Sequence, residues 1–292
     1  MSKSTTPTVL ITGATGNVGT ELIKLLSAKG VSFRALARSA ENAKALAAYK
    51  NAEIITGDLS DQSVVARALD GIERAFLLTN STEQAEALQT SFVHAAKQAG
   101  VQHMVKLSQF AANINSPVRF LRYHAAVEQK IVQSGMTYTF LRPNLFMQGL
   151  LGFRDPIAKQ GKFFASIGDA QISMVDVRDI AAVTAASLIN ETAENNIYDI
   201  TGPEALTHQQ MAGHFSTILK RTVQFINVSA DEMYHAVLSA GFPVWQAEGL
   251  IEDYAHYARG EASAISTAVQ DVTQKAPWHF KQFVNDYAFL FS

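Results

Sequence analysis

The sequence predicts an α/β fold in which a doubly wound parallel sheet carries helices on both faces. Two patterns alternate along the first half of the 292 residues. Short runs rich in β-branched residues recur at 8–12, 32–37, 53–56, 74–79, 103–108 and 137–141, and helical spacing fills 18–29, 41–49, 62–69, 83–99 and 118–134. Strands that alternate with helices form parallel sheets. Glycines at 30, 71, 100 and 135 end the helical patterns and support these boundaries.

After about residue 143 the alternation weakens and helical spacing dominates. We expect helices at 145–159, 178–189, 207–219, 231–239 and 244–259, strands at 197–200 and 223–228, and a last amphipathic stretch at 278–291. The sequence therefore predicts a sheet domain at 1–150 and a smaller, mainly helical part at 151–292 that packs onto it and is not an independent domain. Aromatic side chains of this part either line an apolar cleft or fill the core: Phe146, Phe153, Phe163, Phe164, Phe242, Trp245, Tyr254 and Tyr257.

Composition excludes several classes of function. Lys and Arg total 24 against 26 Asp and Glu, a balance that argues against binding to nucleic acid. The chain has no cysteine, which excludes disulfides and thiolate sites and fits a reducing compartment. Its histidines show no zinc spacing, so no metal is expected. The polar start and the lack of any apolar run of about 20 residues predict a soluble, cytoplasmic protein without a membrane anchor.

The most specific motif is a glycine turn between the first strand and the first helix. Gly13, Gly16 and Gly19 are spaced three apart. Such a turn needs glycine because the backbone bends sharply, approaches a pyrophosphate closely and packs the helix on the strand. The helix N-terminus then offers free N–H groups and a partial positive charge to the anion. The motif predicts a Rossmann-type dinucleotide site formed by Gly13, Thr15, Gly16, Asn17 and Val18.

The end of the second strand indicates which dinucleotide binds there. An NAD site places an acidic residue about 20 positions past the glycine turn to bind the ribose 2′-hydroxyl. Here Arg38 ends the strand and the first acid is Glu41. A guanidinium at this position pairs with a 2′-phosphate, so NADP(H) is preferred over NAD(H). Arg34 lies too early in the strand to reach that phosphate, and the alternative is that Arg38 is only a solvated charge.

The Gly-x-x-Gly-x-x-Gly spacing and its flanking residues resemble the short-chain dehydrogenase/reductase superfamily, and within it the atypical NmrA-like branch. The resemblance implies that Asp58 and Leu59 lie against the adenine and that Thr79 and Asn80 border the ribose. The alternative for Asp58 is a cap on the helix that starts near Asp61.

The predicted catalytic helix departs from the superfamily pattern of a serine followed by Tyr-x-x-x-Lys. Ser108 is present, but counting back from Glu128 puts His124 at the Lys position and Phe120 at the Tyr position. Tyr123 is rotated by about 100° from position 124 on a helix, so it does not replace the missing tyrosine. The resemblance includes quinone reductases and triphenylmethane-dye reductases that lack this Tyr. It implies that Ser108 and His124 orient the reacting end and that His124 holds the ribose. The proton then comes either from water or from His124, as a histidine with a pKa near 6.5. The alternative is a structural histidine.

Further segments fit the same branch. By resemblance, the stretch from Arg142 to Gln148 lies over the nicotinamide, with backbone groups on the carboxamide, so Asn144 and Phe146 complete the predicted site. Asp179 precedes a helical stretch and is expected to cap it or to orient backbone.

The resemblance therefore predicts an NADPH-dependent oxidoreductase that transfers hydride to a quinone or similar conjugated acceptor held between the two halves. Loss of the Tyr and Lys keeps a second hypothesis open, a non-catalytic NADP(H)-binding redox sensor with a protein partner. A third, an epimerase-like enzyme that holds NAD, is disfavoured by Arg38. A homodimer is also possible.

Overall fold

The computed structural model describes residues 7–190 and 193–291; the polar segment 1–6 that the sequence analysis considered lies outside them. The chain forms two compact units that are interleaved along the sequence. The first runs through Ser108 and adds Tyr123–Arg142 and Ile180–Tyr198, and the second takes Gln109–Arg122, Pro143–Asp179 and Asp199 onward. A single boundary near residue 150 therefore does not describe the division, because the chain returns to the first unit after the second has begun.

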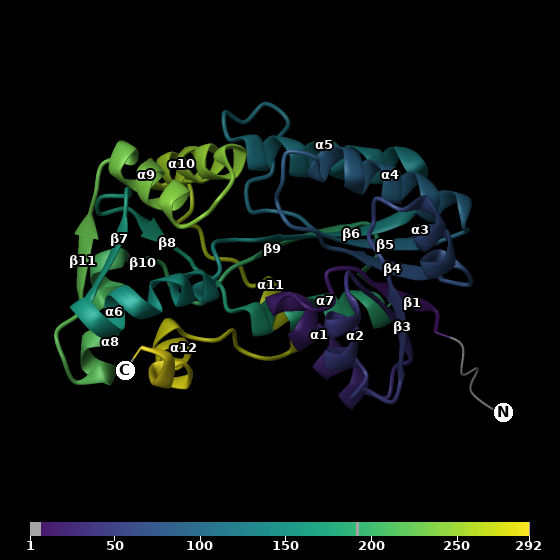
Figure 1. Cartoon of the computed structure of the whole chain (residues 1–292), viewed down its shortest axis with the longest axis horizontal. Helices are drawn as coiled ribbons and strands as arrows, with labels where there is room; N and C mark the ends of the chain where they lie inside the picture. Colours follow the sequence, from purple (N-terminus) through teal and green to yellow (C-terminus); the bar gives the residue numbers. More distant parts are fainter. Residues whose placement is uncertain (1–6, 191–192, 292) are drawn as a thin grey trace. The chain divides into compact units, whose positions relative to one another are not determined.

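A seven-stranded sheet organises the first unit (Figure 1). Its strands are β1 (Val9–Ile11), β2 (Phe33–Ala37), β3 (Ala52–Thr56), β4 (Arg74–Leu77), β5 (His103–Leu107), β6 (Thr137–Pro143) and β9 (Asn196–Ile200). They lie in the order β3-β2-β1-β4-β5-β6-β9, and the first six run parallel. This arrangement confirms the predicted doubly wound sheet, with the switch in strand order between β1 and β4.

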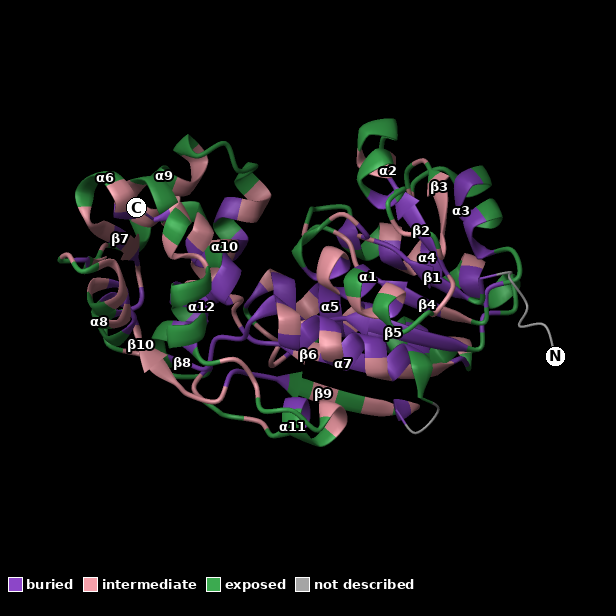
Figure 2. Ribbon diagram, turned by 90° about the horizontal axis from the view of Figure 1, so that it is seen from below, coloured by how far each residue is buried: buried purple, intermediate pink, exposed green. Residues whose placement is uncertain are grey.

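Helices cover both faces of this sheet (Figure 1). They are α1 (Asn17–Ala28), α2 (Ala40–Leu46), α3 (Gln62–Leu69), α4 (Ala85–Gln98), α5 (Arg119–Ser134) and α7 (Val177–Ile189). Helices α3, α4 and α5 bury their apolar sides in one core cluster with the strands, through residues such as Val65, Phe92 and Ile131. Helices α1 and α7 lie on the opposite face. The strands β1, β2 and β5 between the two helical layers are wholly buried, whereas the edge strands β3 and β9 are partly exposed (Figure 2). The carboxyl ends of β1, β2, β4 and β5 thus meet along one edge, where this architecture binds ligands.

The second unit consists mainly of helices. It contains η1 (Met147–Phe153), α6 (Arg154–Gln160), β7 (Lys162–Ala165), β8 (Gln171–Ile172), β10 (Leu206–Thr207), α8 (His208–Leu219), β11 (Gln224–Asn227), α9 (Ala230–Ser239), α10 (Val244–Ala258), α11 (Ala268–Thr273), α12 (Phe280–Asp286) and η3 (Ala288–Leu290). Two expected elements are broken. The stretch 145–159 begins as a 3₁₀ helix, and 278–291 contains a seven-residue helix followed by a 3₁₀ turn. Strands β7, β8 and β10 were missed because runs of two to four residues show no usable period.

Several aromatic side chains of the second unit build its core rather than a cleft. Phe163 and Tyr257 are buried in one cluster, and Phe153 and Tyr254 pack against it. Phe242 is 41% exposed. For these four clustered rings the simpler expectation of core packing is the correct one.

None of the helices within residues 7–190 and 193–291 is long and apolar enough to cross a membrane. No three His, Cys, Asp or Glu side chains within these residues gather closely enough to hold a metal ion.

Candidate dinucleotide and redox site

The turn after β1 is pressed against the end of β4. Gly13 has a φ of +63°, and a Cβ atom there would lie 2.7 Å from Leu78 Cγ and 2.9 Å from the Leu78 carbonyl oxygen. The Thr12 hydroxyl fixes this approach, because its Oγ1 accepts a hydrogen bond from the Leu78 N–H (2.8 Å) and lies 3.0 Å from the carbonyl oxygens of Phe76 and Leu78. Both the positive φ and the crowding therefore require glycine at position 13.

Gly19 and Gly16, the other two glycines of the turn, differ in how much room the protein leaves for a side chain. A Cβ on Gly19 would lie 2.1 Å from the Gly13 carbonyl oxygen, so α1 can approach the turn only without a side chain there. A Cβ on Gly16 would lie 3.4 Å from its nearest neighbour, that same oxygen, and the Gly16 backbone is extended (φ −78°, ψ 175°). The protein itself thus leaves room at Gly16, which is exposed. A ligand that came close to the backbone here would account for the missing side chain.

The N-terminus of α1 is suited to an anion. Within the described residues no side chain caps this end, and its first turn holds no acidic residue. The unsatisfied N–H groups and the positive end of the helix dipole point outward beside Gly16. A pyrophosphate placed there would gain both interactions.

Arg38 follows β2 directly and is exposed. Its positive charge lowers the pKa of Asp58, but less than the hydrogen bonds from the Ser60 hydroxyl and backbone N–H do. No ion pair of Arg38 occurs within residues 7–190 and 193–291. Arg34, in contrast, is buried and is held by Glu53 and by carbonyls around the end of α3. Of these two arginines, Arg38, directly after β2, is the one available to a 2′-phosphate.

The residues predicted around the adenine and ribose lie along the same edge. Asp61, not Asp58, caps α3, because its Oδ1 accepts from the N–H groups of Ser63 and Val64. This result excludes the alternative that Asp58 caps α3; its Oδ1 instead accepts from the backbone N–H and the hydroxyl of Ser60. At the end of β4, Thr79 Oγ1 accepts from Gln89 Nε2 at 2.7 Å. Two further predicted residues complete this edge, the half-buried Leu59 and the exposed Asn80.

Ser108 belongs to a buried polar cluster after β5. Its hydroxyl donates to Glu128 Oε1 at 2.5 Å. The same carboxylate pairs with Arg142, through Nε at 3.0 Å and Nη2 at 2.5 Å. Because the Ser108 proton is committed to Glu128, this hydroxyl can accept a hydrogen bond from a ligand but does not donate one. In the sequence Glu128 serves only to align the helix with the superfamily pattern, and no local pattern predicts this cluster.

A fully buried lysine lies beside His124. Lys106, in the middle of β5, places its Nζ 2.7 Å from His124 Nδ1 and 3.1 Å from the Leu107 carbonyl oxygen. Burial, and secondarily the nearby Lys106 charge, hold the pKa of His124 well below its usual value of 6.5. The expectation that His124 acts as an imidazolium acid with a pKa near 6.5 is therefore wrong. A buried ring beside a cation stays neutral.

The aromatic residues on α5 do not replace the missing tyrosine. Phe120 packs against Trp245, with ring centroids 5.4 Å apart, and occupies the space over Gly249. The Tyr123 ring contacts the His124 ring at a tilt of 31°, with centroids 4.1 Å apart, and its hydroxyl lies 2.7 Å from Ser81 Oγ. The phenol hydroxyl thus has a protein partner away from His124, as its rotated position on the helix predicts.

Asn144, Phe146 and Asp179 lie in the second unit. The Asn144 amide donates to Ser173 Oγ (2.9 Å) and the Ala262 carbonyl (2.8 Å), so its side chain is committed to local structure. This bonding leaves only backbone groups of the segment for a ligand. Phe146 is half-buried and bridges to Val175.

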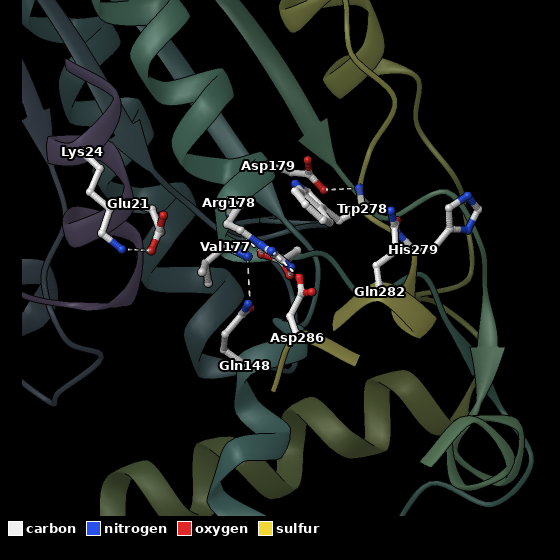
Figure 3. A network of polar contacts seen from close by, with 11 residues as sticks. Glu21, Lys24, Gln148, Val177, Arg178, Asp179, Trp278, His279, Gln282 and Asp286 are labelled. Carbon is white, nitrogen blue, oxygen red and sulfur yellow. Dashed lines mark hydrogen bonds and ion pairs between the residues drawn. The ribbon is translucent and has the colours of Figure 1, made fainter. Parts of the chain in front are cut away.

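Asp179 orients backbone rather than capping α7. Its Oδ2 accepts from the Trp278 N–H at 2.9 Å, as Figure 3 shows. The helix start is instead served by Asp176, whose Oδ1 accepts from the Arg178 N–H. The Arg178 guanidinium lies 3.7 Å from the centre of the Trp278 ring and pairs with both Asp176 and Asp286. Asp179 therefore helps to fix the C-terminal segment in the second unit.

Burial raises the pKa of Asp179 to about 7 from 3.8, against the lowering effect of the Trp278 hydrogen bond. The folded protein then binds more protons than the unfolded chain between about pH 4 and 7, so stability falls as the pH rises through this range. Between pH 5 and pH 8 we expect the free energy of unfolding to fall by roughly 2–3 kcal/mol more in the wild-type protein than in Asp179→Asn, which lacks the titrating carboxyl group. Urea unfolding of both proteins at the two pH values measures this change, and equal pH dependence in the two would contradict it.

The parallel sheet, the glycine turn and the cation after β2 define a dinucleotide-binding Rossmann protein. The chain matches the NmrA-like family over residues 5–285 and belongs to it, as the sequence resemblance predicted. It is 31% identical over 283 residues to the NAD(P)H azoreductase of Xenophilus azovorans, which covers 97% of this chain and 99% of that protein. It is 28% identical over 255 residues to quinone oxidoreductase 2 of Escherichia coli strain K12, with 86% and 88% covered.

Solved structures give the same grouping. The NADPH complex of the NADPH-dependent quinone oxidoreductase from Escherichia coli aligns with a TM-score of 0.87 and 26% identity, covering 96% of this chain and 99% of that one. The NADP(H) complex of triphenylmethane reductase from Citrobacter sp. aligns with a TM-score of 0.85 and 25% identity, covering 95% and 99%. Both similar proteins hold a reduced or oxidised NADP.

Proposed function

We propose that this protein is an NADPH-dependent oxidoreductase that transfers hydride to a quinone or another flat conjugated acceptor. The observation that carries the proposal is the pairing of an open phosphate cradle at Gly16 with an exposed cation at Arg38. That pairing fits the relatives, which are NAD(P)H-dependent reductases of azo compounds, quinones and triphenylmethane dyes. A cytoplasmic location and a homodimer stay predictions.

In this proposal the first unit holds the dinucleotide along the carboxyl ends of its strands. Backbone N–H groups of the α1 turn bind the pyrophosphate, and Arg38 binds the 2′-phosphate. Asp58 and Leu59 lie against the adenine, and Thr79 and Asn80 border the ribose. The predicted contacts of Asn144 and Phe146 with the nicotinamide also belong to the proposal.

The reduced nicotinamide supplies the hydride when it is bound. The protein's contribution is to bind donor and acceptor, orient them and exclude water, since a correct approach of about 3–3.5 Å accounts for much of the catalysis. We expect Ser108 and His124 to be the polar groups that face the reacting end. Neutral His124 has its Nδ1 occupied by Lys106, so the hydrogen on Nε2 is free to bind a ligand oxygen.

A single-turnover experiment tests the proposal. Protein saturated with NADPH is mixed with a panel of quinones and cationic aryl dyes, and the loss of reduced-nicotinamide absorbance is followed. Acceptor-dependent loss establishes the reductase. Tight NADPH binding without loss across the whole panel would instead establish the redox sensor.

The role of His124 leads to a separate prediction. We expect His124→Ala to lower turnover with a quinone by about 10²-fold, because losing one hydrogen-bond donor to an oxygen that gains negative charge costs about that much, and to leave NADPH affinity nearly unchanged. The exposed His94 on α4 provides the matched control, His94→Ala. Unchanged turnover in a folded His124→Ala protein would make His124 purely structural.

A further inference from the structure

Burial of Lys106 costs free energy, because a charged amine must leave water. It lies on β5 with no exposed surface, between Val105 and Leu107, which are also buried. A buried ammonium must be paired, and replacing it with an apolar residue is often neutral or stabilising in other proteins. The Lys106 Nζ contacts only two acceptors among the described residues, His124 Nδ1 at 2.7 Å and the Leu107 carbonyl at 3.1 Å. The side-chain partner of Lys106 is thus His124, which occupies the position of the catalytic lysine in the superfamily pattern.

The charges around Lys106 place it between two protonation states. Burial is the main effect and lowers the pKa of Lys106 to about 7, the Glu128 carboxylate raises it, and the Arg142 guanidinium lowers it. His124 is neutral and adds no charge, and Ser108 is bonded to Glu128. Ammonium and amine are therefore both accessible near neutral pH.

The two states of Lys106 select two forms of the His124 ring. When Lys106 is an ammonium, it donates to Nδ1, so the ring hydrogen is on Nε2. When Lys106 is an amine, it can accept from Nδ1–H, and Nε2 then carries a lone pair. Within residues 7–190 and 193–291 the one side-chain hydrogen bond of His124 is the bond between its Nδ1 and Lys106 Nζ, so Nε2 is left for a ligand. One proton can therefore leave at Nε2 while another enters at Nδ1.

We propose that Lys106 and His124 form a proton relay that delivers one proton to the oxygen of the acceptor once hydride has arrived. This inference rests on the proposed reductase function. For a quinone, one hydride and one proton give the hydroquinone. The Nε2–H bond breaks as the O–H bond forms, the Nδ1–H bond forms as an Nζ–H bond breaks, and Lys106 is left as a neutral amine. His124 contacts the acceptor, and Lys106 acts through it as a positioning residue.

The acceptor itself provides the sharpest kinetic test. A cationic triarylmethane dye becomes its neutral leuco form by taking hydride at carbon, with no proton required. We expect Lys106→Met to lower the quinone rate by about 10²-fold and to leave the dye rate within about threefold of wild type. In the wild-type protein the quinone rate should fall as the pH rises through 7, while the dye rate stays flat. Equal losses for both acceptors, or identical pH profiles, would overturn the relay.

A measurement without turnover separates this inference from the proposed function. The ¹⁵N chemical shifts of the His124 ring report which nitrogen carries the hydrogen, and they are read on the protein alone. We expect the wild-type ring to change tautomer through about pH 7 and the Lys106→Met ring not to change. Constant shifts in the wild-type protein would overturn the relay even if the protein reduces quinones. If the His124 ring changes tautomer with pH but the protein reduces no acceptor, the result would instead overturn the proposed function.

Discussion

Arg38→Asp is expected to lower kcat/KM for NADPH by about 100-fold and to leave the value for NADH nearly unchanged. Charge-assisted hydrogen bonds to a phosphate contribute roughly 1.5–3 kcal/mol, and the new carboxylate adds repulsion of the same phosphate. NADH has no 2′-phosphate, so the substitution removes no hydrogen bond from NADH and adds no repulsion. Arg38 is exposed and pairs with no acid among the described residues, so its replacement leaves no buried charge behind.

Steady-state kinetics with both cofactors and one quinone measure this change. Arg154→Asp is the matched control, since that arginine belongs to α6 of the second unit and its side chain is 65% exposed. It introduces the same change of net charge at a distance from the glycine turn in the sequence. Equal losses for NADPH and NADH in Arg38→Asp would show that another residue discriminates between them.

Replacing the two glycines that flank the start of α1 should give opposite patterns. For Gly19→Ala the new Cβ would meet backbone at 2.1 Å, so we expect a loss of roughly 1–3 kcal/mol in the free energy of unfolding. For Gly16→Ala the new Cβ has 3.4 Å of room, so the free energy of unfolding should fall by no more than about 1 kcal/mol, the usual cost of alanine at a helix N-cap. NADPH affinity should nevertheless fall at least tenfold in Gly16→Ala, about 1.4 kcal/mol, because the methyl group occupies the approach of the phosphates.

Chemical unfolding and NADPH titration of both variants separate these effects. Gly213→Ala in the middle of α8 is the control, because a Cβ there meets nothing within 4 Å. If Gly16→Ala binds NADPH as tightly as the wild-type protein, the turn does not hold a pyrophosphate.

The sheet and the glycine turn were predictable because both depend on local sequence. β-branched runs alternate with helical spacing over short distances, and a strand, three glycines and a helix lie within about 20 residues. The interleaving of the two units was not predictable in this way. It depends on α7 and β9 rejoining the sheet after more than 30 residues in the other unit, and no local period encodes that return.

The candidate site was predicted only in part for the same reason. Ser108 and His124 were found by their order along the chain, but their actual partners come from other elements. Glu128, which is itself paired with Arg142, accepts from the Ser108 hydroxyl, and Lys106 Nζ is hydrogen-bonded to His124 Nδ1. One signal was available in advance: Lys106 is a charged residue inside the strand His103–Leu107, which is otherwise mostly apolar and wholly buried. A lysine in such a strand predicts a buried partner, which sequence alone does not identify.

The central claim is that this chain uses NADPH to reduce a conjugated acceptor. The most direct measurement compares the oxidation of NADPH and NADH by the wild-type protein with a benzoquinone as acceptor, against the same mixtures without protein. We predict protein-dependent oxidation of NADPH with a kcat/KM at least tenfold above that for NADH. No protein-dependent oxidation of either cofactor would contradict the claim, and a preference for NADH would contradict the assignment of Arg38.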